Sequence, residues 1–290
     1  MLRMTNLVGF GVRQRIPPPL DAISTDAAFG FRLLRAGYTG ACVRVRRSSD
    51  NAEADIGFAN GLLNETALLD HCGSGSGFIR TWYDQSGGAR NANQSTSGNQ
   101  PRIVNAGVIE RQNGRPCSVA AGTSSHLLAT ITDVDGLTDL TLNAVGATTF
   151  ASSIDDTSPA FMSVSEDASW GVVYLTPSTT QIGWRFGTGE VSNNRNVSAS
   201  VGTGLNIISL QKQSGTETAR LNGSAAGSST GRQTTMAGNS TNFYVGSSPY
   251  AVTITGLVTS EIILHRAFLA ATPLLGLERN QGAYFGIATP

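Results

Sequence analysis

The sequence is poor in charged residues and has no long hydrophobic run, and each shortage excludes a class of protein. Charged residues make up 14% of its 290 residues, whereas an ordinary soluble domain has roughly 25%. The 20 basic and 20 acidic side chains cancel, so no net charge draws the chain to nucleic acid or to an anionic membrane. No stretch reaches the ~18 apolar residues of a membrane helix. We therefore expect no nucleic-acid partner and no membrane insertion.

Cysteine is also scarce. Cys42, Cys72 and Cys117 are an odd and widely spaced set, which argues against a disulfide framework. The sequence neither requires nor excludes a disulfide between Cys42 and Cys72. No Cys-x-x-Cys or Cys/His spacing of a zinc site is present, so the sequence predicts no metal and no cofactor.

One acidic turn deserves comparison with a calcium site. Asp50, Asn51 and Asp55 offer oxygen ligands, but their spacing matches no defined calcium loop. We expect Asp50 to accept hydrogen bonds from turn amides or to pair with Arg46 or Arg47 instead.

What the chain has in plenty is glycine, together with serine, threonine and asparagine. There are 34 glycines, and from about residue 116 short apolar runs alternate with turn-forming residues. This texture is typical of a mainly β domain, and Asn222-Gly223 is a hairpin signal because both residues tolerate positive φ. The expected strands are 38–47, 77–83, 137–145, 160–164, 171–175, 181–186, 206–211, 218–221, 242–246 and 256–265.

Three short helices are expected beside these strands. Residues 24–36 carry a capping Ser24 or Thr25 and apolar residues at helical spacing. Residues 65–72 end before Gly73, and a third helix within 267–286 begins near Pro273.

Residues 1–20 look like an arm that precedes a single domain at 21–290. Pro17-Pro18-Pro19 is stiff and extended, and the segment before it lacks the apolar core and cleavage site of a signal peptide. Two interpretations stand: a disordered terminus, or an arm that docks on a larger assembly.

Two motifs carry a family resemblance. Arg44-Val45-Arg46-Arg47-Ser48-Ser49-Asp50-Asn51 is followed by Ala54-Asp55-Ile56-Gly57-Phe58 and then by Thr81-Trp82-Tyr83-Asp84-Gln85-Ser86-Gly87. This block resembles the N-terminal part of the catalytic domain of the α-L-arabinofuranosidase B family. The resemblance implies a concanavalin-A-like jelly-roll β-sandwich with short helices near both ends. The block is similar, too, to one carried by phage virion proteins. In such proteins a closing segment like Glu278-Arg279-Asn280-Gln281-Gly282-Ala283-Tyr284 packs back on the sandwich.

The catalytic pattern of that family is incomplete here. The family's general acid is an aspartate, and the matching stretch, Phe243-Tyr244-Val245-Gly246-Ser247-Ser248-Pro249-Tyr250, has Ser247 at that position. A serine hydroxyl has no pKa suited to a general acid. Glu166 is the candidate for the family's nucleophile, and the family's adjacent cysteine pair is absent. These departures favour a protein that is not an enzyme.

Aromatic and polar side chains of the same regions are the candidate carbohydrate-binding residues, because rings stack on sugar faces while carboxylates and amides bond sugar hydroxyls. For Asp84 the alternative is a turn in which it caps backbone amides while Trp82 joins the core. The carbohydrate-binding candidates are Trp82, Asp84, Gln85, Trp170 and Tyr250.

The resemblance thus predicts a phage or phage-derived virion surface protein, a head or tail fibre or spike component located on the virion. Its partners would be cell-surface polysaccharide, other virion proteins through the arm, and further copies of itself. The alternatives are an arabinofuranosidase-type glycoside hydrolase and a structural decoration protein.

Overall fold

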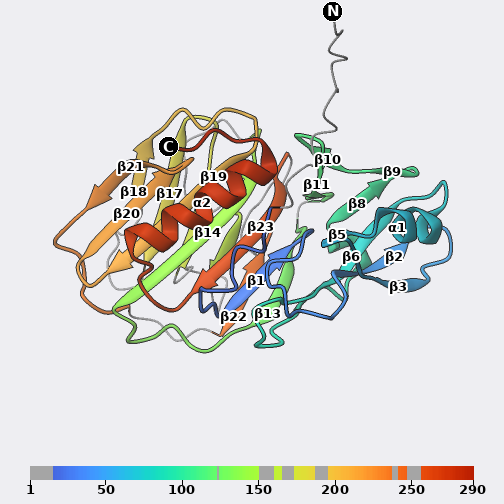
Figure 1. Ribbon diagram of the computed structural model, residues 1–290, viewed down its shortest axis with the longest axis horizontal. Helices are drawn as coiled ribbons and strands as arrows, with labels where there is room; N and C mark the ends of the chain where they lie inside the picture. The colour runs from blue at the N-terminus through green and yellow to red at the C-terminus, as the bar shows by residue number, and fades with distance from the viewer. Residues whose placement is uncertain are drawn as a thin grey trace, which may run out of the picture.

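The chain folds into two packed β layers, as the sequence predicts. The computed structural model describes residues 16–122, 124–149, 160–164, 173–186, 195–236, 241–246 and 256–290. Within them, strands of both layers join into one 19-stranded antiparallel arrangement, and two short helices lie outside it (Figure 1). This is the mainly β sandwich expected from the glycine-rich, strand-and-turn texture.

The first layer is built around a long central strand that is buried on both faces. That strand, β14, pairs with β19 on one side and β23 on the other. Strands β1 and β12 then share the outer edge of β23. Across the layer the strands are β21 (Ser224–Ser229), β20 (Thr216–Leu221), β19 (Asn206–Gln213), β14 (Asp139–Ala147), β23 (Val258–His265), β1 (Ala27–Gly30) and β12 (Ser118–Val119).

The second layer faces the first, and β6 (Gly77–Trp82) links the two. Strand β6 pairs with β7 of the second layer and with β8 (Arg102–Asn105), and β8 pairs in turn with β12 of the first layer. Across the layer the strands are β18 (Arg195–Ser198), β17 (Gln181–Phe186), β16 (Val173–Pro177), β15 (Met162–Val164), β22 (Asn242–Val245), β13 (Leu127–Thr130) and β7 (Ala92–Asn93).

A smaller lobe extends from β6. It holds the strands next to β6, one helix and two separate hairpins, and it lies beside the sandwich in Figure 1. Its elements are β2 (Val43–Arg47), β3 (Glu53–Ile56), β4 (Phe58–Ala59), β5 (Leu62–Leu63), α1 (Glu65–Cys72), a 3₁₀ turn (Ser97–Asn99), β9 (Val108–Ile109), β10 (Arg111–Gln112) and β11 (Arg115–Pro116).

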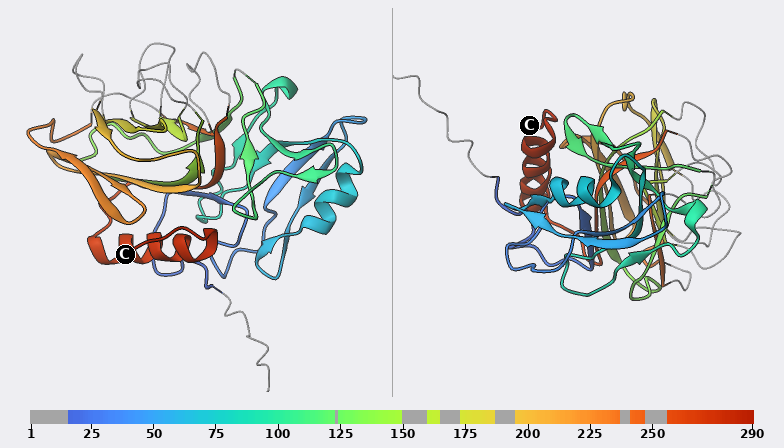
Figure 2. Two further views of the ribbon diagram at one scale, coloured as in Figure 1. Left: turned by 90° about the horizontal axis from the view of Figure 1, so that it is seen from above. Right: turned by 90° about the vertical axis from the view of Figure 1, so that its right-hand side faces the viewer.

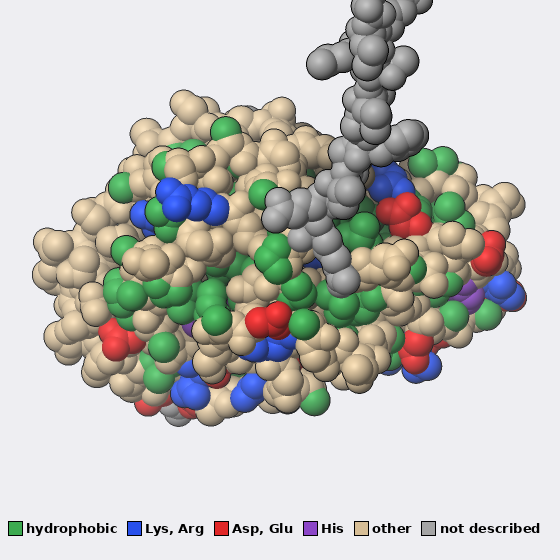
Figure 3. Space-filling model, in the orientation of Figure 1, with side chains coloured by type: hydrophobic (Ala, Val, Ile, Leu, Met, Phe, Trp, Pro, Cys, Tyr) green, Lys and Arg blue, Asp and Glu red, His purple; other side chains and the backbone are tan. Residues whose placement is uncertain are grey.

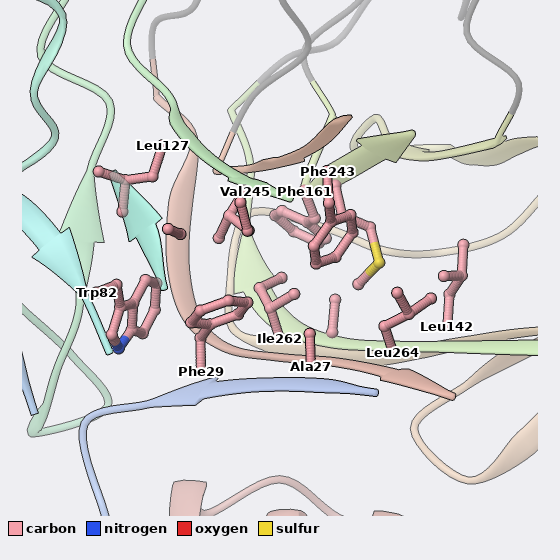
Figure 4. Close-up of a cluster of buried hydrophobic side chains, with 14 of the residues drawn as sticks. Ala27, Phe29, Trp82, Leu127, Leu142, Phe161, Phe243, Val245, Ile262 and Leu264 are labelled. Atoms are coloured by element: carbon pink, nitrogen blue, oxygen red, sulfur yellow. The ribbon is translucent and has the colours of Figure 1, made fainter. Parts of the chain in front are cut away.

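Apolar side chains from both layers meet between them. Figure 4 shows Phe29, Ile262 and Leu264 of the first layer pointing toward Phe243 of the second. All four are fully buried, and burial of each such side chain contributes about 1.5–3 kcal/mol. This shared core holds the layers together.

Helix α2 (Ala271–Phe285) covers the outer face of the first layer, opposite the core (Figures 1 and 2). Its contact with the sheet is partly polar: Arg32 donates to Glu261 at 2.8 Å, and Gln281 donates to the same carboxylate at 2.9 Å. Glu278 of the helix accepts from Ser209 of β19 and pairs with Arg220 of β20. The predicted packing of Glu278–Tyr284 on the sandwich is therefore confirmed.

Several local predictions are confirmed residue by residue. Helix α1 begins and ends at the predicted Glu65 and Cys72, and Asn64 caps it by accepting a hydrogen bond from Ala67. The hairpin signal joins β20 to β21, with φ of 51° at Asn222 and 83° at Gly223. Positive φ at both positions is what a two-residue hairpin turn requires.

The predicted helix over residues 24–36 is wrong. Residues Ala27–Gly30 form strand β1, and all four are buried. Ala27 and Phe29 face the core between the layers, whereas Ala28 packs with Leu277 beneath α2. A strand that is buried on both faces shows no alternation, so its short apolar run cannot be told from a buried helix by pattern alone.

The three cysteines are free and buried, so Cys42 and Cys72 form no bridge. Of the predicted arm, residues 1–15 lie outside the described residues. The adjoining segment contacts α2: Pro17 accepts a hydrogen bond from Asn280, and Leu20 packs with Leu277. No helix among the described residues is long and apolar enough to span a membrane.

Burial of His265 at the end of β23 predicts a loss of stability in acid. Its ring is fully buried and contacts the Ser24 carbonyl through Nδ1 at 2.9 Å. Burial lowers the pKa of His265 below the ordinary 6.5, although the Ser24 carbonyl and Asp26 oppose this. The unfolded chain therefore binds the proton more readily, so the free energy of unfolding should fall as pH drops below about 6.5.

Urea unfolding at a series of pH values from neutral to mildly acidic checks this expectation. The His265→Asn variant keeps a donor for the Ser24 carbonyl and removes the titrating group, so its acid dependence should be shallower. An unchanged pH dependence in this variant would assign the acid sensitivity to other groups.

Candidate functional site

Trp82, the first predicted carbohydrate-binding residue, lies in the core. It is 1% exposed, and its ring stacks on Phe31 with centroids 4.5 Å apart. Figure 4 shows it at the edge of the cluster formed between the layers. The indole presents no face to solvent, which matches the core interpretation of this residue and not a role as a sugar platform.

Asp84 and Gln85 follow Trp82 and bond the backbone around them. Asp84 accepts from the backbone N–H groups of Ala28, Ser86 and Arg90 at 2.8–3.0 Å. Gln85 accepts from Leu34 N–H at 2.8 Å. The bond from Asp84 to the amide two residues later confirms the predicted turn. Both side chains are buried, and these bonds fix the loop after β6 to β1 and to Leu34.

The other predicted residues, Glu166, Trp170, Ser247 and Tyr250, lie outside the described residues. The strand ends that lead to them are described. Strand β15 ends at Val164, β16 begins at Val173 and β22 ends at Val245. In the second layer, β15 lies between β16 and β22. Because Met162 pairs with Val245, the chain leaves β15 toward Glu166 at one end of this strand pair and leaves β22 toward Ser247 at the other.

The outer face of the second layer carries the described part of the candidate site. Register places Leu128, Tyr244 and Ser163 side by side across three strands. Neighbours in such a row lie on the same face of a sheet.

Two polar side chains lie in or beside this row. His126 meets the Tyr244 ring edge-on with centroids 5.2 Å apart, and burial lowers the pKa of His126 below 6.5. The imidazole is therefore neutral near pH 7, with one donor and one acceptor nitrogen. The hydroxyl of Ser163 is buried and has no partner among the described residues. Sequence reasoning missed both, because only cross-strand register brings them together.

The acidic turn after β2 forms ion pairs. Asp50 pairs with Arg47 at 2.7 Å and accepts from the Ala52 N–H at 3.0 Å, as predicted. Hydrogen bonding to Arg47 lowers the pKa of the Asp50 carboxyl. No three His, Cys, Asp or Glu side chains converge on a point that could hold a metal ion in the part of the chain that the structure describes.

Comparison with known proteins bears on the class of this sandwich. Residues 21–133 match the family model of the α-L-arabinofuranosidase B catalytic domain. They contain both motifs that carry the resemblance in the sequence, so the resemblance is confirmed for that part of the chain. The chain is similar to the catalytic domain of this family in sequence pattern and in layered architecture.

Solved structures extend the likeness of fold to most of the chain. One is an arabinofuranosidase complexed with arabinofuranosyl-α-1,2-xylobiose, at a TM-score of 0.65 and 16% identity. Another is a GH54 α-L-arabinofuranosidase soaked with a cyclic sulfate inhibitor, at a TM-score of 0.59 and 17% identity. Each alignment covers 88% of this chain and 62% of the other, so the chain spans less than two thirds of either relative. The curated proteins contain no match to this sequence.

Proposed function

We propose that the chain is a glycoside hydrolase of arabinofuranosidase type, acting on α-L-arabinofuranosides. The observation that carries this proposal is the match of residues 21–133 to the arabinofuranosidase B catalytic domain. The shared fold over 88% of the chain supports it. The hydrolase proposal takes precedence over the virion role, because the similar solved structures are arabinofuranosidases.

Hydrolysis of a glycoside usually needs two carboxyl groups that flank the scissile bond. Many described carboxylates are already engaged: Glu53, Glu65, Glu110 and Glu261, for example, pair with arginines. Five carboxylates lie outside the described residues, in segments that adjoin strands β15 to β18 of the second layer. They are Asp155, Asp156, Glu166, Asp167 and Glu190. We propose that the nucleophile is among them, with Glu166 as first candidate.

Release of 4-nitrophenol from 4-nitrophenyl α-L-arabinofuranoside tests this proposal. We expect turnover by the wild-type chain and a loss of at least about a hundredfold in Glu166→Gln, because a group that acts directly on the reacting bond contributes at least that much. Asp167→Asn is the matched alternative.

Glu110→Gln serves as the control, because Glu110 pairs with Arg102 in the small lobe and has no part in the proposed reaction. Its turnover should equal that of the wild type. A wild-type chain that releases no 4-nitrophenol would end the hydrolase proposal. A loss confined to Asp167→Asn would move the nucleophile by one residue.

A second candidate is a virion surface protein that binds cell-surface polysaccharide without cleaving it. Two observations favour it: Ser247 stands where the family has its acid, and the closing segment packs on the sandwich as in the phage-borne type. In this proposal residues 1–20 dock on other virion proteins, and copies of the chain associate. Binding on a glycan array without product release would support it, and a light-scattering mass would give the number of copies.

A further inference from the structure

Two hollows lie side by side in the region where β2, β3 and β6 meet the loop after β6. The larger has a volume of about 400 Å³ and is lined by Tyr38, Asp55, Tyr83 and Asn91, among others. The smaller, of about 360 Å³, is lined by Asp21, Arg35, Tyr38 and Gly87. Tyr38 and Gly87 line both hollows, so together they form one groove divided by the Tyr38 side chain. This groove is separate from the outer face of the second layer.

The Tyr38 side chain is held firmly in this position. Its hydroxyl donates to the Ala41 carbonyl at 2.8 Å, and its ring meets Phe58 edge-on at 6.2 Å. Gly40 is required beside it, because a Cβ there would lie 2.5 Å from the Tyr38 hydroxyl. A fixed ring binds with little loss of conformational freedom, so Tyr38 is a preorganised surface for stacking.

The hydroxyls of the groove stay protonated at physiological pH. Burial, as the largest cause, raises the pKa of Tyr38 to about 12 and that of Tyr83 to about 12. The Tyr83 hydroxyl donates to Asp55 Oδ1 at 2.7 Å. Each phenol oxygen keeps a lone pair that can accept a hydrogen bond from a ligand.

Further donors and acceptors surround the two rings. Asp55 Oδ2 and the Asn91 side-chain N–H groups have no hydrogen-bond partner among the described residues, while Asn91 Oδ1 accepts from the Asp84 N–H. In the smaller hollow, the Arg35 guanidinium bonds the protein: its terminal nitrogens donate to the Leu20 and Ile23 carbonyls and to the Thr25 hydroxyl, and Nε is buried. Acceptors and donors thus alternate with aromatic surface along the groove.

The lining of the groove holds more carboxylates than arginines. Asp55 and Asp84 line the larger hollow, and Asp21 and Arg35 line the smaller; Asp55 is paired with Arg44 at 3.0 Å, and Asp84 accepts from three backbone N–H groups. Such a lining disfavours an anionic ligand. Stacking surface combined with unpaired donors and acceptors suits a molecule that has many hydroxyls and apolar C–H faces.

We propose that this groove binds a neutral saccharide, with Tyr38 as the stacking platform between two sugar positions. Asp55 and Asn91 bond the hydroxyls of the sugar in the larger hollow. The site is an accessory binding site and takes no part in bond cleavage. It shares the class of ligand with the proposed hydrolase function but does not depend on hydrolysis.

The test is a titration of the full-length chain with arabinofuranosyl-α-1,2-xylobiose and with xylobiose, followed by the backbone amide NMR signals. We expect concentration-dependent shifts of the Gly40, Ala41 and Gly87 amides, with millimolar affinity. Tyr38→Ala should weaken binding about tenfold, because ring stacking supplies about that much. Tyr38→Phe keeps the ring and should bind within about threefold of the wild type.

A second variant keeps the test decisive if Tyr38→Ala does not fold. Ala41→Leu adds an apolar side chain to the lining of the larger hollow and removes no hydrogen-bonding group, so it should abolish the shifts. Val108→Ala, at a remote and largely exposed position, should change nothing. Absence of shifts with both sugars, or equal binding by the wild type, Tyr38→Ala and Ala41→Leu, would overturn the proposal.

The outcome is distinguishable from failure of the hydrolase proposal. Glu166→Gln should bind sugar in the groove as the wild type does, even where turnover of the nitrophenyl substrate is lost. If the wild-type chain has no turnover but shifts these amides, the groove stands and the hydrolase proposal falls. Turnover without the shifts gives the opposite result.

Discussion

Replacing Arg32 with methionine is expected to lower the free energy of unfolding by about 3–5 kcal/mol, because it leaves a buried carboxylate without its cation. Glu261 is fully buried, and Arg32 reaches it with Nε at 2.8 Å and a second nitrogen at 3.3 Å. The guanidinium also lies 4.5 Å from the centroid of the Tyr284 ring. Among the described side chains, Gln281 would remain to bond Glu261, and an amide supplies no charge.

Chemical denaturation followed by circular dichroism measures this loss. Arg102→Met is the matched control. Arg102 Nε lies 2.7 Å from Glu110 Oε1, but this pair is partly exposed, and such pairs contribute about 1 kcal/mol or less. The double variant Arg32→Met with Glu261→Leu removes both charges and should recover part of the loss. Equal losses in Arg32→Met and Arg102→Met would show that burial of the Arg32 pair does not matter.

Introducing an acid at Ser247 is expected to have the largest effect on activity, provided that the chain is a hydrolase. Ser247 stands where the resembled family has its general acid, and a positioned general acid contributes about 10²–10⁴-fold. Ser247→Asp should therefore raise turnover of arabinofuranosyl-α-1,2-xylobiose, whose leaving sugar needs a proton. Turnover of the nitrophenyl substrate should change little, because nitrophenolate leaves without one.

Measuring both substrates in parallel separates acid catalysis from a general change in binding. The gain on the natural-type substrate should decline as pH rises, because the new carboxyl works as an acid only when it is protonated. Ser248→Asp is the neighbouring control and should give no gain. Equal effects of Ser247→Asp on the two substrates would contradict a missing acid at this position.

Much of the fold could be predicted from the sequence, because most strands obey local rules. Runs such as Gln181–Phe186 are bounded by turn residues, and Glu65–Cys72 has a cap at one end and glycine at the other. Strand β1 could not be predicted, because contacts from both sides bury it: the core on one face and α2 on the other. Such contacts are made by residues far away in the chain.

The functional surfaces were harder to predict than the fold. The Trp82–Asp84 motif lies beside the proposed groove: Trp82 is buried in the core, whereas Asp84 lines the larger hollow together with Tyr38, Asp55 and Asn91. Nothing in the local sequence indicates that Tyr38 and Tyr83 share a hollow. That juxtaposition depends on how β2, β3 and β6 pair.

The pairing of β1 and β12 with β23 also has a consequence for biosynthesis. Ala27 lies opposite Leu264, and Ser118 lies opposite Thr259. Nearly the whole chain must therefore leave the ribosome before the first strand finds its partner, and closing so large a loop is slow. A nascent chain interrupted in its second half would expose β1 without its partner strand, and neighbouring nascent chains could capture it.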